Sequence, residues 1–125
     1  VIDFQDALVG PVTYDVMSLM YDHYISWPYE KILQWVRGYH QLLLQRGVLS
    51  VDDFDEFMRW HDWLALQRIL KNLGNFVRLK LLHNKPGYCQ DIPRIYQYLI
   101  DIARRYEALA PLAALLECYR PEALR

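Results

Sequence analysis

Residues 50–73, with the sequence SVDDFDEFMRWHDWLALQRILKNL, decide the fold of this protein. Their apolar side chains recur every three or four residues, which is the spacing of one face of an α-helix. The face consists of Phe54, Phe57, Met58, His61, Leu64, Ala65, Arg68 and Ile69. Residues 50–53 have the form of a capping box, in which Asp53 takes the place of the usual glutamate. The pattern therefore predicts a long helix over residues 51–73.

The segments before this stretch carry the same helical period. A first helix is predicted from Thr13, a suitable N-cap, with Asp15 in the first turn, where a negative charge suits the helix dipole. A second helix is predicted over residues 26–46, with Gly47 as its C-terminal stop. The expected apolar faces are Tyr14, Met17, Met20 and Tyr21 in the first, and Ile32, Trp35, Val36, Tyr39 and Leu43 in the second.

The segments after the stretch are predicted to be helical as well. Gly74 is expected to break or kink the long helix, and residues 75–83 are expected to form a further helical stretch. Residues 84–87, Asn-Lys-Pro-Gly, predict a turn. Residues 91–93 open another helix, and residues 110–120 form a short last one. The inner face of the former is expected to hold Ile92, Ile95, Tyr96, Leu99, Ile102 and Tyr106. The fold class is therefore mainly α.

The first four residues, Val-Ile-Asp-Phe, differ from the rest because they favour a β-strand. No partner strand is near them in the sequence, and an isolated strand cannot satisfy its backbone hydrogen-bonding groups. We therefore expect residue 1 to lie inside a larger protein that contains the paired sheet. Asp3 ends this run, where a carboxylate can serve as a ligand for Mg²⁺. On spacing alone, an aspartate that caps a turn is the simpler explanation of Asp3.

Composition and charge exclude several classes of function. Hydrophobic residues make up 54% of the chain, enough for a buried core. The formal net charge of −1 provides no broad basic surface, so we expect no nucleic-acid and no membrane partner. No apolar run approaches the about 20 residues of a membrane span, and no signal peptide is visible. The two cysteines, Cys89 and Cys118, lack metal-type spacing, so a reducing compartment such as the cytoplasm is the simpler interpretation.

The N-terminal segment carries a resemblance to a known family. Residues 1–7, Gly10-Pro11 and Tyr14-Asp15 together resemble the metal-binding segment of the aminoglycoside phosphotransferase and choline kinase-like enzymes. That family has a two-lobed, protein-kinase-like α+β fold. The resemblance implies that this chain is the C-terminal helical subdomain of such a fold, with a strand remnant at its N-terminus. It also implies that Asp3 coordinates the Mg²⁺ bound to ATP, and that Asp15 supports the catalytic loop.

Two further segments narrow the resemblance. Residues 66–79 and residues 88–94 are similar to segments of bacterial N-acetylmuramate/N-acetylglucosamine kinases. Those enzymes phosphorylate the anomeric hydroxyl of amino sugars in cell-wall recycling. The resemblance therefore implies ATP as co-substrate and a sugar as acceptor. The nucleotide-binding lobe and the catalytic loop, with its base, are expected upstream of Val1, so this chain alone is expected to be inactive.

Four other residues are candidates for contacts with nucleotide or substrate, and each has a simpler alternative. Gln5 replaces the glycine that follows Asp-Phe in protein kinases; it either points its amide to the nucleotide or sugar, or bonds neighbouring backbone. Asp6 is either a second carboxylate of the metal site or a turn former. Asp22 and Tyr24 end the first predicted helix, where an acceptor sugar would find polar groups and an aromatic face. The alternative is a solvated helix end.

Arg68 lies on the apolar face of the long helix, where an unpaired charge is costly. It either binds the carboxylate of a muramic-acid-type substrate or forms an internal ion pair. The candidate ion-pair partners are Asp15, Asp22 and Asp91. His61 on the same face is interpreted as a hydrogen-bonded core histidine. The tryptophans Trp27, Trp35, Trp60 and Trp63 are expected to be core or interface anchors.

Two alternatives to an amino-sugar kinase remain. The acceptor can instead be an aminoglycoside or a choline-type alcohol, or the chain can be a non-catalytic helical interaction module. The interaction module is distinguished from a kinase by the sequence upstream of Val1. A kinase requires a His-x-Asp there, with an asparagine five residues after the aspartate.

Overall fold

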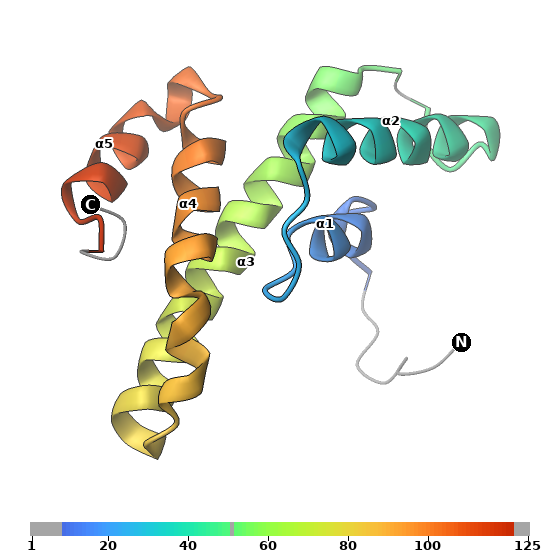
Figure 1. Ribbon diagram of the computed structural model, residues 1–125. Helices are drawn as coiled ribbons and strands as arrows, with labels where there is room; N and C mark the ends of the chain where they lie inside the picture. Colours follow the sequence, from blue (N-terminus) through green and yellow to red (C-terminus); the bar gives the residue numbers. More distant parts are fainter. Residues whose placement is uncertain (1–8, 51, 122–125) are drawn as a thin grey trace.

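The computed structural model describes residues 9–50 and 52–121, which form a set of packed helices (Figure 1). The α-helices are α1 (Tyr14–Met20), α2 (Tyr29–Gln45), α3 (Phe54–His83), α4 (Ile92–Ala103) and α5 (Ala110–Cys118), and the 3₁₀ helices are η1 (Pro86–Asp91) and η2 (Glu107–Leu109). Within these residues no strand is formed, which confirms the mainly α class. The strand expected at residues 1–4 lies outside the described residues.

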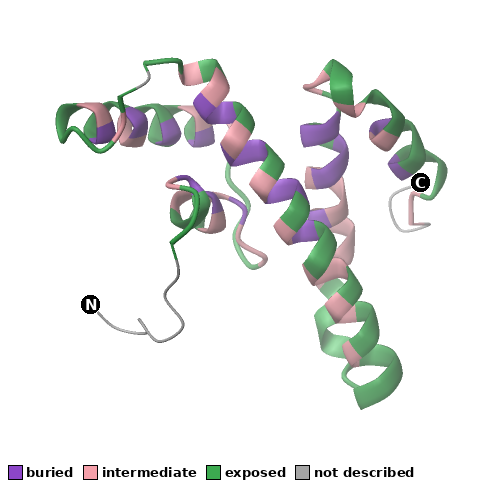
Figure 2. Cartoon of the chain, turned by 180° about the vertical axis from the view of Figure 1, so that it is seen from behind, coloured by how far each residue is buried: buried purple, intermediate pink, exposed green. Residues whose placement is uncertain are grey.

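The helix α3 is the central element of the fold. It lies between α4 on one side and α1 and α2 on the other, and α5 packs against α4 (Figure 1). Figure 2 shows the buried residues on the faces that these helices turn to one another, whereas the C-terminal turns of α3 are largely exposed. The fully buried core residues come from α1, α2, α3 and α4 and include Met17, Val36, Ile69, Leu99 and Ile102. None of the helices in the described ranges is both long and apolar enough to cross a membrane.

The C-terminus of α2 confirms the predicted stop at Gly47. Gly47 has a φ of 66°, which glycine adopts without the steric cost that a Cβ brings. The backbone N–H of Val48 donates to the carbonyl of Leu43 at 2.9 Å, and the N–H of Gly47 donates to the carbonyl of Leu44 at 3.0 Å. These two hydrogen bonds are those of a Schellman motif, which satisfies carbonyl groups that the helix end leaves unpaired.

The start of α3 differs from the prediction by three residues. Asp53 is the N-cap itself, with φ −109° and ψ 97°, and its carboxylate accepts a hydrogen bond of 3.0 Å from the backbone N–H of Glu56. The N-cap hydrogen bond therefore joins Asp53 and Glu56, three residues later than the capping box that the sequence predicted. The expected box was wrong because both segments share the same residue spacing, and the apolar face of the helix begins only at Phe54.

Removal of this cap is expected to destabilise the protein modestly. Replacing Asp53 by alanine leaves the N–H of Glu56 without its side-chain acceptor, which typically costs about 1 kcal/mol. Asp52→Ala is the matched control, because Asp52 is exposed and one residue outside the cap. Thermal unfolding should show a lower melting temperature for Asp53→Ala alone. Equal melting temperatures for the two variants would contradict the capping role.

The break expected at Gly74 is wrong, because α3 continues without interruption from Phe54 to His83. A single glycine lowers helix stability by about 1 kcal/mol relative to alanine but keeps its backbone N–H, so packing of α3 against η1 and α4 outweighs the cost. The helix ends at Asn84, whose φ of 50° is left-handed, and the N–H of Lys85 donates to the carbonyl of Leu79 at 3.1 Å. The turn predicted for residues 84–87 thus ends the helix as expected.

The predicted apolar faces are partly wrong at their edges. Trp35 and Tyr14 remain 37% and 39% exposed, and His40 is buried in the face of α2 where Trp35 was expected. The imidazole of His40 lies between two rings, with centroid distances of 5.5 Å to Phe54 and 4.8 Å to Phe57. A helix packed on one side buries only a narrow stripe, and long-range aromatic contacts decided which residues it contains.

Thr13 precedes the first residue of α1, as predicted, but its side chain makes no cap hydrogen bond. Its backbone is already helical, with φ −83° and ψ −9°, which is unlike the extended backbone of a usual N-cap. Its carbonyl accepts the hydrogen bond of the Met17 N–H at 2.9 Å. The predicted position is therefore confirmed and the predicted side-chain cap is wrong.

Candidate functional site

The segment between α1 and α2, residues 21–28, is called here the α1–α2 loop, and arginines from other elements hold its backbone. Arg68 of α3 donates from Nη1 to the carbonyl of Tyr21 in a long contact of 3.5 Å. Arg94 of α4 donates to the carbonyl of His23 and forms an ion pair with Asp91. Two loop carbonyls are thus bonded to cations from two helices, which fixes the loop relative to the core.

A buried carboxylate, Asp62 of α3, holds a third arginine against the same loop. Its side chain is fully buried, and Oδ2 accepts hydrogen bonds from Arg105 Nη1 at 2.9 Å and from the Tyr106 hydroxyl at 3.0 Å. The Tyr21 hydroxyl donates to Oδ1 at 3.4 Å, and His61 Nδ1 lies 3.1 Å from the same oxygen. Each carboxylate oxygen thus has two neighbouring hydrogen-bonding groups. A buried charge is tolerated when it is paired and hydrogen-bonded in this way.

The surroundings decide the charge states in this network. Burial alone would raise the pKa of Asp62, but the hydrogen bond from His61 and the charge of Arg105 outweigh it and lower the pKa below its ordinary value. Burial, followed by the charge of Asp62, raises the pKa of both Tyr21 and Tyr106. At neutral pH the carboxylate is therefore ionised and both tyrosines are protonated hydrogen-bond donors.

The sequence did not single out Asp62. It lies between His61 and Trp63, one position from the predicted apolar face, and an aspartate there is usually solvated. The available signal was its helical spacing from Met58 and Leu66, which are both buried. The interpretation of His61 as a hydrogen-bonded core histidine is confirmed, since it is fully buried against Asp62.

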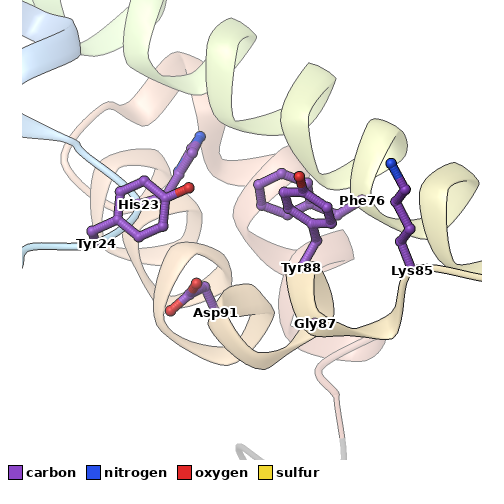
Figure 3. Close-up of a pocket in the computed structure, with 7 residues that line it drawn as sticks. All are labelled: His23, Tyr24, Phe76, Lys85, Gly87, Tyr88 and Asp91. Carbon is purple, nitrogen blue, oxygen red and sulfur yellow. The ribbon is translucent and has the colours of Figure 1, made fainter.

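An aromatic cavity of about 370 Å³ opens beside the α1–α2 loop (Figure 3). It is lined by His23, Tyr24, Phe76, Lys85, Gly87, Tyr88 and Asp91. Phe76 and Tyr88 stack with a centroid distance of 5.6 Å, and His23 meets Phe76 edge-on at 5.3 Å. In Figure 3 this stack faces the His23–Tyr24 pair across the cavity, with Asp91 below. Aromatic faces combined with a few polar groups are typical of small-molecule sites.

His23 contributes a neutral imidazole to this cavity. Burial and the nearby charge of Arg68 lower its pKa below the ordinary value, so the ring is uncharged at neutral pH. Its Nε2 lies 2.6 Å from the side-chain nitrogen of Asn72, and accepts that hydrogen bond in the tautomer with the proton on Nδ1. Among the described residues, His23 Nδ1 has no hydrogen-bond partner.

Two more hollows adjoin the α1–α2 loop. The first, called here the arginine cavity, has a volume of about 340 Å³ and lies between the loop and α4. It is lined by Tyr21, Ser26, Trp27, Tyr29, Ile32, Pro93, Arg94, Gln97, Tyr98, Asp101 and Arg105. The second is an apolar groove of about 520 Å³ lined by Leu19, Met20, Asp22, Tyr24, Ile25, Trp27 and Trp35. These three hollows share this loop, which makes it a candidate ligand-binding segment, whereas a further hollow of about 430 Å³ lies away from it, lined by Pro11, Trp60, Trp63 and Leu64.

The structure brings together some of the sequence candidates. Tyr24 is 75% exposed and lines both the aromatic cavity and the apolar groove, beside residues of the 88–94 segment. Asp22 accepts a hydrogen bond of 2.7 Å from the backbone N–H of Tyr24, so it shapes the loop as well as lining the groove. Asp15 is exposed on α1. Asp3, Gln5 and Asp6 lie outside the described residues.

Arg68 does not form the predicted ion pairs with Asp15, Asp22 or Asp91. The ion pairs found in residues 9–50 and 52–121 do not include it, and its hydrogen bond goes to a backbone carbonyl. Trp27, Trp35 and Trp63 are partly exposed, and Trp27 meets Trp35 edge-on at 5.0 Å. They are therefore anchors at the surface and not members of the core.

No metal site is assembled by the part of the chain that the structure describes. It contains no group of three histidine, cysteine or acidic side chains placed to hold an ion. Cys89 and Cys118 are both free thiols. Asp3, which the sequence predicts to be the magnesium ligand, lies outside those ranges.

The chain is similar to curated proteins of one kind. It is 46% identical over 116 residues to a Neisseria meningitidis protein named N-acetylmuramate/N-acetylglucosamine kinase, covering 93% of this chain and 35% of that protein. Proteins of the same name from Pseudomonas aeruginosa and Pseudomonas putida are 40% and 38% identical over 116 residues, 93% of this chain and 34% of each protein. The chain thus spans about a third of the length of these relatives. No family model and no solved structure matches it.

Proposed function

We propose that this chain is the helical C-terminal part of an ATP-dependent sugar kinase that phosphorylates the anomeric hydroxyl of N-acetylmuramate or N-acetylglucosamine. The observation that carries the proposal is the 46% identity over 116 residues to a kinase named for those two sugars. Because the chain spans only about a third of such relatives, the nucleotide-binding lobe and the catalytic base would come from the remainder of the protein. The chain alone would therefore be inactive.

Phosphoryl transfer depends on positioning and charge neutralisation more than on covalent chemistry by the protein. In this proposal Asp3 would be a ligand of Mg²⁺, which neutralises charge on the phosphates of ATP when it is bound. Asp15 would support the catalytic loop from α1, and Gln5 and Asp6 would lie close to the same site.

The described residues would bind and orient the acceptor sugar. The α1–α2 loop is the proposed acceptor loop, with Tyr24 and Asp22 as its contacts. Arg68, Arg94 and Arg105 fix this loop before any ligand arrives. A pre-fixed loop lowers the entropic cost of binding and keeps the acceptor hydroxyl in line with the phosphate.

An activity screen of the full-length parent tests the proposal. With ATP, we expect turnover of N-acetylmuramate and N-acetylglucosamine in a coupled assay, and none of an aminoglycoside or choline. If only choline or an aminoglycoside is phosphorylated, that compound replaces the two amino sugars as the proposed acceptor. Absence of turnover with every acceptor, together with an upstream sequence that lacks His-x-Asp, would support the alternative of a non-catalytic helical module.

A further inference from the structure

The arginine cavity contains hydrogen-bond donors that the described residues do not use. Arg105 donates hydrogen bonds from Nη1 to the Tyr21 hydroxyl and to the Asp62 carboxylate. Its Nε and Nη2 make no hydrogen bond within the described ranges. Arg94 Nε and the Tyr98 hydroxyl are both buried and have no partner there. Buried donors without a partner are costly, so the two such groups beside this cavity, together with the N–H groups of Arg105 that bond to no described residue, indicate a ligand that supplies acceptor oxygens.

These donors are held rigidly. The guanidinium of Arg105 lies on the ring of Tyr29, with 3.7 Å between its Cζ and the ring centroid, and Asp62 fixes its inner edge. The ring of Tyr98 packs edge-on against Tyr21 with a centroid distance of 5.4 Å. A guanidinium fixed on two sides presents its remaining N–H groups in one orientation, which suits the two oxygens of a carboxylate.

The charges around the cavity limit the ligand to a modest negative charge. Arg105 is paired with Asp62, and Arg94 is paired with Asp91. Asp101, an exposed acid on the rim, accepts a hydrogen bond of 2.7 Å from Gln97. With both arginines already balanced, a single carboxylate is better matched than a doubly charged phosphate. Apolar and aromatic walls provide contact area for a ring: Trp27, Tyr29, Ile32 and Pro93.

The aromatic cavity does not offer the same set of groups. Its charged side chains are Lys85, which is exposed on a flexible four-carbon stem, and Asp91, which is an acid already paired with Arg94. Its one buried donor or acceptor without a described partner is on His23. A carboxylate therefore has better-fixed partners in the arginine cavity.

We infer that the arginine cavity is a carboxylate-binding site, in which Arg105, Arg94 and Tyr98 bind the acid group of a carboxylate-bearing sugar. The inference rests on the proposed function and deepens it, because N-acetylmuramate carries a carboxylate that N-acetylglucosamine lacks. Arg105 takes the role that the sequence suggested for Arg68, which does not line this cavity and makes a long contact of 3.5 Å with the Tyr21 carbonyl. Arg105 and its two partners would then determine which of the two sugars binds more tightly.

Tyr98→Phe in the full-length protein tests the inference, because it removes one hydroxyl that has no partner among the described residues. Calorimetric titration should show about tenfold weaker binding of N-acetylmuramate, as expected for loss of a hydrogen bond to a charged group, and an unchanged affinity for N-acetylglucosamine. The melting temperature should not fall. Tyr119→Phe is the matched control, since Tyr119 is exposed and lines none of the cavities.

Arg105→Lys is the second variant, which keeps the charge beside Asp62 but loses the planar fork. It should weaken the binding of N-acetylmuramate more than the binding of N-acetylglucosamine, by at least the factor seen for Tyr98→Phe. Equal weakening of both sugars by either variant, or no change in Tyr98→Phe, would overturn the inference. If the wild-type protein binds N-acetylmuramate selectively but transfers no phosphate, the proposed function is wrong, whereas the carboxylate site is still supported.

Discussion

Replacing Asp62 by asparagine is expected to lower the free energy of unfolding by about 3 kcal/mol. The substitution preserves the size of the side chain but removes the buried negative charge that pairs with Arg105. It also places an amide nitrogen among side chains that all offer hydrogen-bond donors, namely His61, Tyr21 and Tyr106. The uncompensated charge of Arg105 and the crowding of donors act together, so we expect a large loss of stability from a change that preserves the size of the side chain.

Thermal and urea unfolding measure the effect, and Glu117→Gln provides the control. Glu117 makes an ion pair with Arg104 at the surface, with the two side chains 43% and 57% exposed. The same carboxylate-to-amide change there should cost less than about 1 kcal/mol, because solvent screens the pair. For Asp62→Asn a fall in melting temperature of about 10 °C is expected for a chain of this size. A fall no larger than that of Glu117→Gln would show that the network contributes little.

The same network gives the wild-type protein a defined dependence on acid. The pKa of Asp62 is lower in the folded protein than in the unfolded chain, so the folded state binds fewer protons at this site. Its stabilising contribution is complete above the ordinary aspartate range and is lost as the pH falls through the folded pKa. Asp62→Asn should remove this part of the acid sensitivity, so its stability should decline less steeply below the ordinary aspartate range.

Asp3→Asn in the full-length parent is expected to abolish kinase activity without unfolding the protein. In the proposed function Asp3 is a metal ligand, and asparagine has similar shape but no negative charge with which to hold Mg²⁺. Because the metal neutralises charge that develops on the transferring phosphoryl group, we expect a loss of kcat of at least about 100-fold. The assay couples ADP production to N-acetylmuramate phosphorylation and is repeated over a range of magnesium concentrations.

Asp52→Asn is the control, because it makes the same exchange at an exposed residue next to the cap of α3. It should retain full activity. Asp3→Asn with near wild-type turnover would remove Asp3 from the metal site, and the resemblance of residues 1–15 would then no longer support a phosphotransferase. Loss of activity with an equally large loss of stability would assign Asp3 to the fold instead.

The sequence by itself determined the helical class and most of the helix ends, because both depend on neighbouring residues. The apolar period over residues 54–69 is a local property, and so are the left-handed glycine at Gly47 and the turn at residues 84–87. These features form wherever the segment finds an apolar surface to cover. The contact between Tyr24 and a ligand, which the sequence predicted from its place at a helix end, stays a prediction, and the structure adds that Tyr24 lines two hollows.

Only the tertiary structure decided what the buried polar residues do. Asp62 contacts Tyr21, 41 residues earlier, and Arg105, 43 residues later, while Arg94 reaches the carbonyl of His23 across 71 residues. Local periodicity carries no information about such pairs, since any acid and any arginine on two helices could form them. The continuation of α3 through Gly74 and the arginine cavity have the same origin, because contacts between distant segments outweigh the preference of a single residue.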